Sequence, residues 1–272
     1  MATLSAVLIT LNEEANIKRC LESVRWADEI IVVDSFSSDR TVDVAKQFTP
    51  HVYQHEYPGS TRQMEKGIQY ATGDWILFID ADEEVSFQLS EEIQQMLERG
   101  TVMTGYELLR KPRAFGKWIY HGGWYPDYQL RLLRKDSYTV NHEEVHGGFF
   151  TKGSHTRMRG IVYHYTYETI EEYVGKMNEY TSLQVSNRIK GYSSVGAHWY
   201  NFFLSPASHF LRMFFSKKGY RDGFHGFLLA VLDALYSMVL YMKVWEYRTC
   251  KEKGMPLPPI SNREFNMLKK LQ

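Results

Sequence analysis

Carboxylates are concentrated in one short stretch of the sequence, Asp80-Ala81-Asp82-Glu83-Glu84. The stretch follows the apolar run Trp75–Ile79, so its carboxylates are expected to project from the end of a buried strand. Hard divalent cations prefer oxygen ligands, and Mg²⁺ or Mn²⁺ commonly links one or two carboxylates to substrate phosphates. The spacing therefore favours a divalent-metal site, although a solvated acidic turn is the alternative for an isolated Asp-x-Asp pair.

Two other polar residues fall at comparable positions. Asn12 follows the apolar run 4–10, and Asp34 ends the apolar run 29–34. Short helices are expected between such runs, the first of them capped by Asn12. Strands that alternate with helices form an open, doubly wound, mostly parallel α/β sheet, in which ligands bind beyond the carboxyl ends of the strands. The three polar positions are therefore expected to meet at one sheet edge.

The pattern of elements changes after about residue 103. Further strands are expected at 51–55 and 75–79, with a helix at about 61–71 between them. Later runs predict two antiparallel strands, 105–110 and 129–134, and a helix at 168–189. We expect a catalytic domain over residues 1–165 and a helical C-terminal region over residues 166–272.

Several classes of protein are disfavoured. No Gly-x-Gly-x-x-Gly follows the first strand and no Gly-x-x-x-x-Gly-Lys-Ser/Thr occurs, which argues against the common dinucleotide and triphosphate sites. Cys20 and Cys250 have no neighbours at zinc-site spacing. No basic and aromatic stripe accompanies a nucleic-acid-binding module, so nucleic acid is not an expected partner.

At this point the motifs resemble those of a known family. Ordered along the chain they are Ile9–Glu14, Ile31–Ser35, Ser38–Thr41, Arg62, Gly67, Ala71–Asp82, Gly122–Asp127, Arg131–Arg134, His142-Glu143 and His164-Tyr165. Their order and spacing resemble family 2 glycosyltransferases with a GT-A fold, in the branch that includes lipopolysaccharide core glucosyltransferases. Two positions depart from the family pattern: Phe36 stands where a small residue is frequent, and Asn141 replaces a hydrophobic residue before His-Glu.

The resemblance implies a nucleotide-sugar donor, a divalent metal and roles for individual residues. It assigns nucleotide-sugar binding to Thr10, Leu11, Asn12, Glu13, Asp34, Arg62, Asp80, Ala81 and Arg131. It assigns metal ligation to Asp82, Asp80 and His164. On its own, a histidine that follows an apolar run is more often a satisfied core residue than a ligand.

Sugar transfer also requires a base that removes the proton of the acceptor hydroxyl. Asp127 is the first candidate, because it lies in a loop shortly before Arg131, and Glu143 is the second. The resemblance implies an inverting hexosyltransferase with UDP-glucose as donor and a glycan or glycolipid such as lipopolysaccharide core as acceptor. A nucleotidyltransferase and a catalytically silent nucleotide- or glycan-binding protein are the alternatives.

The charge of the chain is unevenly distributed. Residues 1–100 hold 8 Lys and Arg against 18 Asp and Glu, whereas the chain contains 32 of each kind. The C-terminal region mixes aromatic residues such as Phe214 and Phe215 with cations such as Lys217 and Lys218, which favours peripheral contact with a membrane. A helical cap on the catalytic core is the alternative. The most apolar run, Gly226–Met242, contains Asp233, and residues 1–10 lack a secretory signal, so we expect a cytoplasmic protein at the inner face of the cytoplasmic membrane.

Overall fold

The computed structural model describes residues 1–141, 148–191 and 200–258, and the chain divides into two compact units. The first unit comprises residues 1–112 and 126–166, and the second comprises residues 113–125 and 167–272. The segment 113–125 thus belongs with the C-terminal region, although it lies inside the N-terminal half of the sequence. Whether the functional boundary lies at residue 165 stays a prediction.

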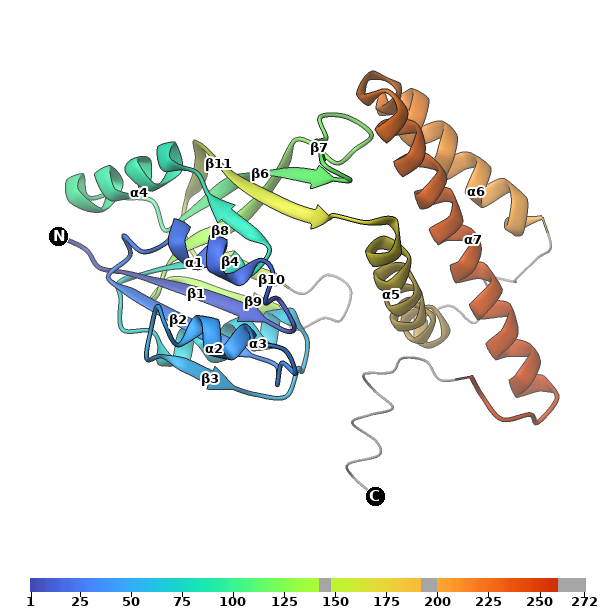
Figure 1. Ribbon diagram of the computed structural model, residues 1–272, viewed down its shortest axis with the longest axis horizontal. Helices are drawn as coiled ribbons and strands as arrows, with labels where there is room; N and C mark the ends of the chain where they lie inside the picture. The colour runs from blue at the N-terminus through green and yellow to red at the C-terminus, as the bar shows by residue number, and fades with distance from the viewer. Residues whose placement is uncertain (142–147, 192–199, 259–272) are drawn as a thin grey trace. The chain divides into compact units, whose positions relative to one another are not determined.

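The first unit is built on a mixed sheet (Figure 1). Its elements are β1 Leu4–Thr10, α1 Ile17–Ser23, β2 Glu29–Asp34, α2 Thr41–Ala45, β3 Val52–Gln54, α3 Ser60–Tyr70, β4 Trp75–Asp80, β5 Glu83–Val85, α4 Phe87–Arg99, β6 Gly105–Ala114, β8 Asp127–Arg134, β9 Tyr138–Asn141, β10 Gly148–Thr151 and β11 His155–Tyr167. The last residues of β6 and of β11 belong to the second unit. The order of the sheet is β3-β2-β1-β4-β8-β6-β11-β5, with β7 Lys117–Trp118 paired to β6, while β9 and β10 form a separate ribbon.

The parallel half of the sheet confirms the doubly wound α/β prediction. β1 pairs in parallel with β2 and β4, and β2 pairs in parallel with β3. Side chains alternate between two hydrophobic clusters, so that Leu8 and Leu77 lie on one face of the sheet while Val7 and Phe78 lie on the other. Both faces are therefore covered, which explains why these strands read as continuous apolar runs.

The later strands pair in antiparallel fashion, as predicted. β8 pairs antiparallel with both β4 and β6, and β5 pairs antiparallel with β11. β6 is longer than predicted and extends to Ala114. These strands carry the side chains that surround the end of β4.

The prediction that Asn12 caps the first helix is wrong. α1 begins at Ile17, and its N-cap position is Asn16, which makes no capping hydrogen bond through its side chain. Asn12 instead has a left-handed backbone with φ 55°, and its side-chain oxygen accepts a hydrogen bond from the Ser38 N–H at 2.8 Å. The residue joins the loop after β1 to the loop after β2, because a short amide tolerates this backbone and bonds locally.

The second unit is mainly helical. It contains β7 and the helices α5 Ile170–Gly191, α6 Asn201–Leu211, η1 Arg212–Ser216, η2 Gly219–Asp222 and α7 Phe224–Glu252. α6 runs beside α7 as a helical hairpin, and α5 also packs on α7. Within the described part of the chain, α7 is the helix that is long and apolar enough to cross a membrane by length and composition.

Candidate functional site

The Asp80-Ala81-Asp82 turn lies where β4 ends, and neighbouring strands bring charged side chains to it. Pairing of β5 with β11 sets His164 opposite Glu83. Pairing of β6 with β8 sets Arg110 opposite Asp127. The register of the antiparallel strands therefore gathers residues that are up to 84 positions apart in the sequence, from Asp80 to His164.

Arg131 binds the first carboxylate of the turn. Its Nη2 atom donates to Asp80 Oδ2 at 2.7 Å, and the same atom lies 3.7 Å from Glu83 Oε1. Burial alone raises the pKa of Asp80, but the Arg131 guanidinium, helped by Arg110, holds it below its usual range. Burial in turn lowers the pKa of Arg131, but Asp80 and Glu83 raise it above its usual value, so the pair stays charged.

One nitrogen of Arg131 is left without a partner. Its Nη1 atom is buried and makes no hydrogen bond within the residues that the structure describes, and the same is true of the hydroxyl of Thr10. Buried polar groups are normally paired, so this donor has capacity for a partner from outside the chain. A phosphate oxygen would satisfy the guanidinium, which agrees with the prediction that Arg131 holds a diphosphate.

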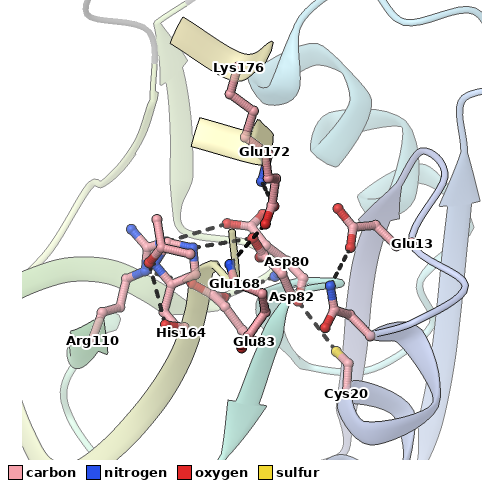
Figure 2. A network of polar contacts seen from close by, with 12 residues as sticks. Glu13, Cys20, Asp80, Asp82, Glu83, Arg110, His164, Glu168, Glu172 and Lys176 are labelled. Atoms are coloured by element: carbon pink, nitrogen blue, oxygen red, sulfur yellow. Dashed lines mark hydrogen bonds and ion pairs between the residues drawn. The ribbon is translucent and has the colours of Figure 1, made fainter. Parts of the chain in front are cut away.

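Arg110 is a central residue that sequence reasoning missed. Its Nε donates to Glu83 Oε1 at 2.5 Å and its Nη2 lies 3.0 Å from His164 Nδ1 (Figure 2). Its Nη1 donates to Asp127 Oδ2 at 3.2 Å. The guanidinium side chain is 11% exposed and the Glu83 side chain 1%. Arg110 thus links the acidic turn, the candidate base and the candidate histidine ligand.

The metal candidates are only partly brought together. His164 Nε2 lies 3.3 Å from Asp82 Oδ2, whereas Asp80 turns to Arg131. No group of three or more His, Cys, Asp or Glu side chains is placed to hold a metal ion in the ranges 1–141, 148–191 and 200–258. The donor set of one carboxylate and one imidazole still suits a divalent cation that completes its coordination with phosphate oxygens and water.

Asp127 is accessible enough for a substrate to reach it. Its side chain is 38% exposed, and Gln129 Nε2 donates to its Oδ2 at 3.2 Å beside the bond from Arg110. Glu143, the second candidate base, lies outside the described residues, as does His142.

The other predicted binding residues surround the ends of β1 and β2. Asp34 is fully buried and accepts hydrogen bonds from the Ser37 N–H at 2.9 Å, from the Ser37 hydroxyl and from Gln54 Nε2 at 3.0 Å. The Glu13 N–H donates to the Thr41 hydroxyl at 2.8 Å. These bonds fix the loops after the two strands against each other, and Asp34 holds the backbone at Ser37.

The remaining positions differ in exposure. Leu11 is half-buried, Ala81 is buried beneath the turn, and Arg62 is exposed on α3. Neither Leu11 nor Ala81 can contribute more than backbone groups to a polar ligand. Arg62 has a long, exposed cationic side chain, which suits contact with an anionic ligand.

The known proteins that the chain is similar to are glycosyltransferases. The model of "Glycosyl transferase family 2" matches residues 5–157. The chain is similar to the lipopolysaccharide core biosynthesis glycosyltransferase LpsC of Rhizobium meliloti, with 28% identity over 92% of this chain and 94% of the relative. It is 31% identical to a glycosyltransferase of Rickettsia prowazekii over 90% of this chain and 87% of the relative. Glucosyl-3-phosphoglycerate synthase from Mycobacterium tuberculosis, solved with Mn²⁺ and UDP, aligns with 68% of this chain and 79% of its own at 17% identity and a TM-score of 0.44.

Proposed function

The chain belongs to glycosyl transferase family 2, and we propose that it moves a hexose, glucose from UDP-glucose, to a hydroxyl of a lipid-linked or cell-envelope glycan. The similarity to a lipopolysaccharide core transferase supports lipopolysaccharide core as the acceptor class. An acceptor of this kind places the enzyme in the cytoplasm at the inner face of the cytoplasmic membrane. The catalytic residues proposed here lie between residues 1 and 165, which leaves the helical region for the acceptor and the membrane.

The observation that carries this proposal is the buried Arg131 guanidinium at the end of β4. It is held by Asp80 at 2.7 Å and keeps one nitrogen unpaired, beside the Asp82–His164 pair. A fixed cation with a free donor is suited to a diphosphate, because charge-assisted hydrogen bonds to phosphate are strong and directional. Arg131 therefore orients the diphosphate of the donor, and Arg62 adds a second positive charge at its outer side.

The nucleoside occupies the ends of β1 and β2. The unpaired Thr10 hydroxyl and the backbone at Leu11 face this ligand, while the bonds of Asn12, Glu13 and Asp34 hold the two loops in place. Asp82 and His164, with Asp80, are the residues that would hold Mg²⁺ or Mn²⁺. When bound, a divalent cation supplies stabilisation of the negative charge that grows on the leaving diphosphate.

Asp127 is proposed as the general base. Its carboxylate is oriented by Arg110 and Gln129 and is still partly exposed, so it can accept the proton of an acceptor hydroxyl within hydrogen-bond reach. Attack by that hydroxyl on the anomeric carbon, opposite the leaving diphosphate, inverts the anomeric centre. Glu143 is kept as the second candidate.

Thermal-shift measurements with UDP-, GDP-, CMP- and dTDP-sugars, with and without Mn²⁺, test the donor and the metal together. The UDP-sugar should stabilise the protein in a metal-dependent manner, by about 2.7 kcal/mol at a hundredfold excess over its Kd. Asp82→Ala should remove the metal-dependent part of this stabilisation. Asp136→Ala, at an exposed carboxylate just after β8, is the matched control and should behave as wild type.

Two results would contradict the proposal. One is equal stabilisation by all four nucleotide classes. The other is an unchanged metal effect in Asp82→Ala.

The stereochemistry is tested separately by the anomeric proton coupling of the product, which distinguishes an inverted linkage from a retained one. A silent binding protein would bind the nucleotide and yield no product at all.

A further inference from the structure

Two polar pairs join α6 to α7 beside a mainly apolar buried face of α7. On the inner side, His209 Nδ1 lies 3.0 Å from Asp233 Oδ2, and the hydroxyls of Ser205 and Ser237 lie 2.8 Å apart. These four residues include Asp233, the charge in the middle of the most apolar run of the chain. The charge is therefore turned toward the partner helix and is hydrogen-bonded there.

The outward face of α7 is a continuous apolar stripe. The residues Phe224, Val231, Leu235, Met242 and Trp245 recur at spacings of three, four or seven, which keeps them on one side of a helix. Phe224 is 72% exposed and Trp245 52% exposed, so both ends of the stripe are accessible to solvent. α6 also exposes two apolar residues, Phe203 and Leu204. Exposed helix faces in water are normally polar, and this one is the reverse.

Four cations surround the turn of the hairpin, and the adjacent acid Asp222 accepts backbone N–H groups of Tyr120 and His121. Arg212, Lys217, Lys218 and Arg221 are all exposed, and the sequence contains no Asp or Glu from residue 200 to residue 221. No ion pair joins these four side chains to a carboxylate in the part of the chain that the structure describes. Leu211 and Phe215 are exposed among them. Apolar anchors beside unpaired cations match the surface of a bilayer that contains anionic lipid.

We propose that the outward face of the α6–α7 hairpin docks on an anionic phospholipid bilayer, with α7 lying in the plane of the interface. Spanning is disfavoured because α5, which packs on α7, carries Glu171, Glu172 and Lys176, and these charges would enter the hydrocarbon. The interhelical pairs His209–Asp233 and Ser205–Ser237 are the kind of polar contact that joins helices in lipid.

The same hairpin turn holds the loop that precedes Asp127 in the chain. Asp222 Oδ2 accepts the N–H of Tyr120 at 3.1 Å and that of His121 at 2.7 Å, and the Lys217 carbonyl accepts the Gly122 N–H at 2.9 Å. The lipid-bound turn would thus hold residues 120–122, which precede the proposed base in the chain. The link to a lipid-linked acceptor rests on the proposed function.

Flotation with vesicles tests the docking surface without any donor or activity, so its failure is distinguishable from failure of the proposed function. The full chain should float with vesicles that contain phosphatidylglycerol and much less with pure phosphatidylcholine. Lys217→Ala combined with Lys218→Ala should weaken vesicle binding about fivefold per cation. Added salt should also weaken vesicle binding, because it screens exposed charges. Leu235→Gln and Met242→Gln, at two exposed positions of the stripe, should each weaken vesicle binding about tenfold.

Val102→Gln is the matched control, because Val102 is 88% exposed but lies in the first unit. It should bind vesicles as the wild type does, and far-UV circular dichroism should show all variants folded. Absence of flotation with anionic vesicles would overturn the proposal, as would equal flotation of Leu235→Gln and wild type. Dimerisation in lipid-free buffer that is lost in Leu235→Gln, without vesicle binding, would assign the face to a second copy of the chain and overturn it as well.

Discussion

Arg110 donates to Glu83 across 2.5 Å, and both side chains are buried, at 11% and 1% exposure. Glu83 also supports the turn itself, because its other oxygen accepts the Asp80 N–H at 2.9 Å. The pair therefore fixes the backbone of the acidic turn as well as the guanidinium that reaches Asp127.

Arg110→Met should destabilise the protein strongly, because buried Glu83 then keeps only Arg131, whose Nη2 atom is 3.7 Å from its Oε1 atom. Loss of one partner of a buried pair typically costs about 3–5 kcal/mol. Chemical denaturation measures this loss. Arg157→Met is the matched control: Arg157 pairs with Glu107 at 2.8 Å but its side chain is 61% exposed, so its unfolding midpoint should match wild type. Equal stability of Arg110→Met and wild type would remove the structural role assigned to the pair.

Asp127→Asn should lower kcat about 10²- to 10⁴-fold, because the amide cannot accept the acceptor proton. The affinity for UDP should not change, since Asp127 is placed on the acceptor side. Steady-state kinetics and UDP titration by calorimetry separate the two quantities. Asp136→Asn is the control at an exposed position. If Asp127→Asn keeps full kcat, Glu143 becomes the first candidate for the base.

The hydrogen bonds of Glu29 should make the free energy of unfolding depend on pH in the acidic range. Burial raises its pKa, but hydrogen bonds from the Ser5 hydroxyl at 2.6 Å and from the Thr72 N–H at 2.8 Å outweigh this and lower the pKa. A depressed folded-state pKa contributes stability that is present above the unfolded value of about 4.3 and is lost as the pH falls through the folded value. The free energy of unfolding of Glu29→Gln should therefore fall less steeply in this acidic window than that of wild type.

Chemical denaturation at a series of acidic pH values measures this slope. Glu91→Gln, at an exposed residue of α4, is the control and should follow the wild-type curve. An identical slope in Glu29→Gln and wild type would show that the hydrogen bonds to Glu29 persist equally in the unfolded chain.

Two glycines in helices should respond oppositely to alanine. A Cβ at Gly226 would lie 1.8 Å from the Gly219 carbonyl oxygen, which is backbone and cannot rotate away, whereas a Cβ at Gly175 meets nothing within 4 Å. Gly226→Ala should destabilise the second unit by about 1–3 kcal/mol through overpacking. Gly175→Ala should stabilise it by about 0.5–1 kcal/mol, because alanine loses less entropy in a helix. Thermal unfolding followed by far-UV circular dichroism tests both signs.

The parallel half of the fold could be predicted because its signals are local. Residues 4–10, 29–34 and 75–79 are mainly apolar runs, and each is a buried strand. The charged network could not be predicted in the same way. Arg110 reaches Asp127 through the register of β6 with β8, which depends on pairing across 17 positions and leaves no local pattern. The only available signal was an arginine inside a predicted strand, and that pattern is far too common to identify a site.

The grouping at the acidic turn was predicted only in part. Asp82 and His164 do lie together, but Asp80 binds Arg131, a contact that sequence reasoning did not foresee. From the sequence, the types of side chain near the end of a strand can be read. Which of several nearby groups each carboxylate binds depends on differences in distance of a few ångströms, which the sequence does not contain. The prediction for Asn12 was wrong for a related reason, because its side chain bonds to another loop and not to its own helix.

The membership of residues 113–125 in the second unit limits how this protein can be recombined with its relatives. The core of that unit takes Ala114 and Ile119 from this segment, with Met213 and Leu229 from the C-terminal helices. A chimera joined at a single crossover near residue 166 would separate one half of this core from the other. A chimera made to exchange acceptor specificity should therefore take both segments, residues 113–125 and residues 167–272, from the same relative.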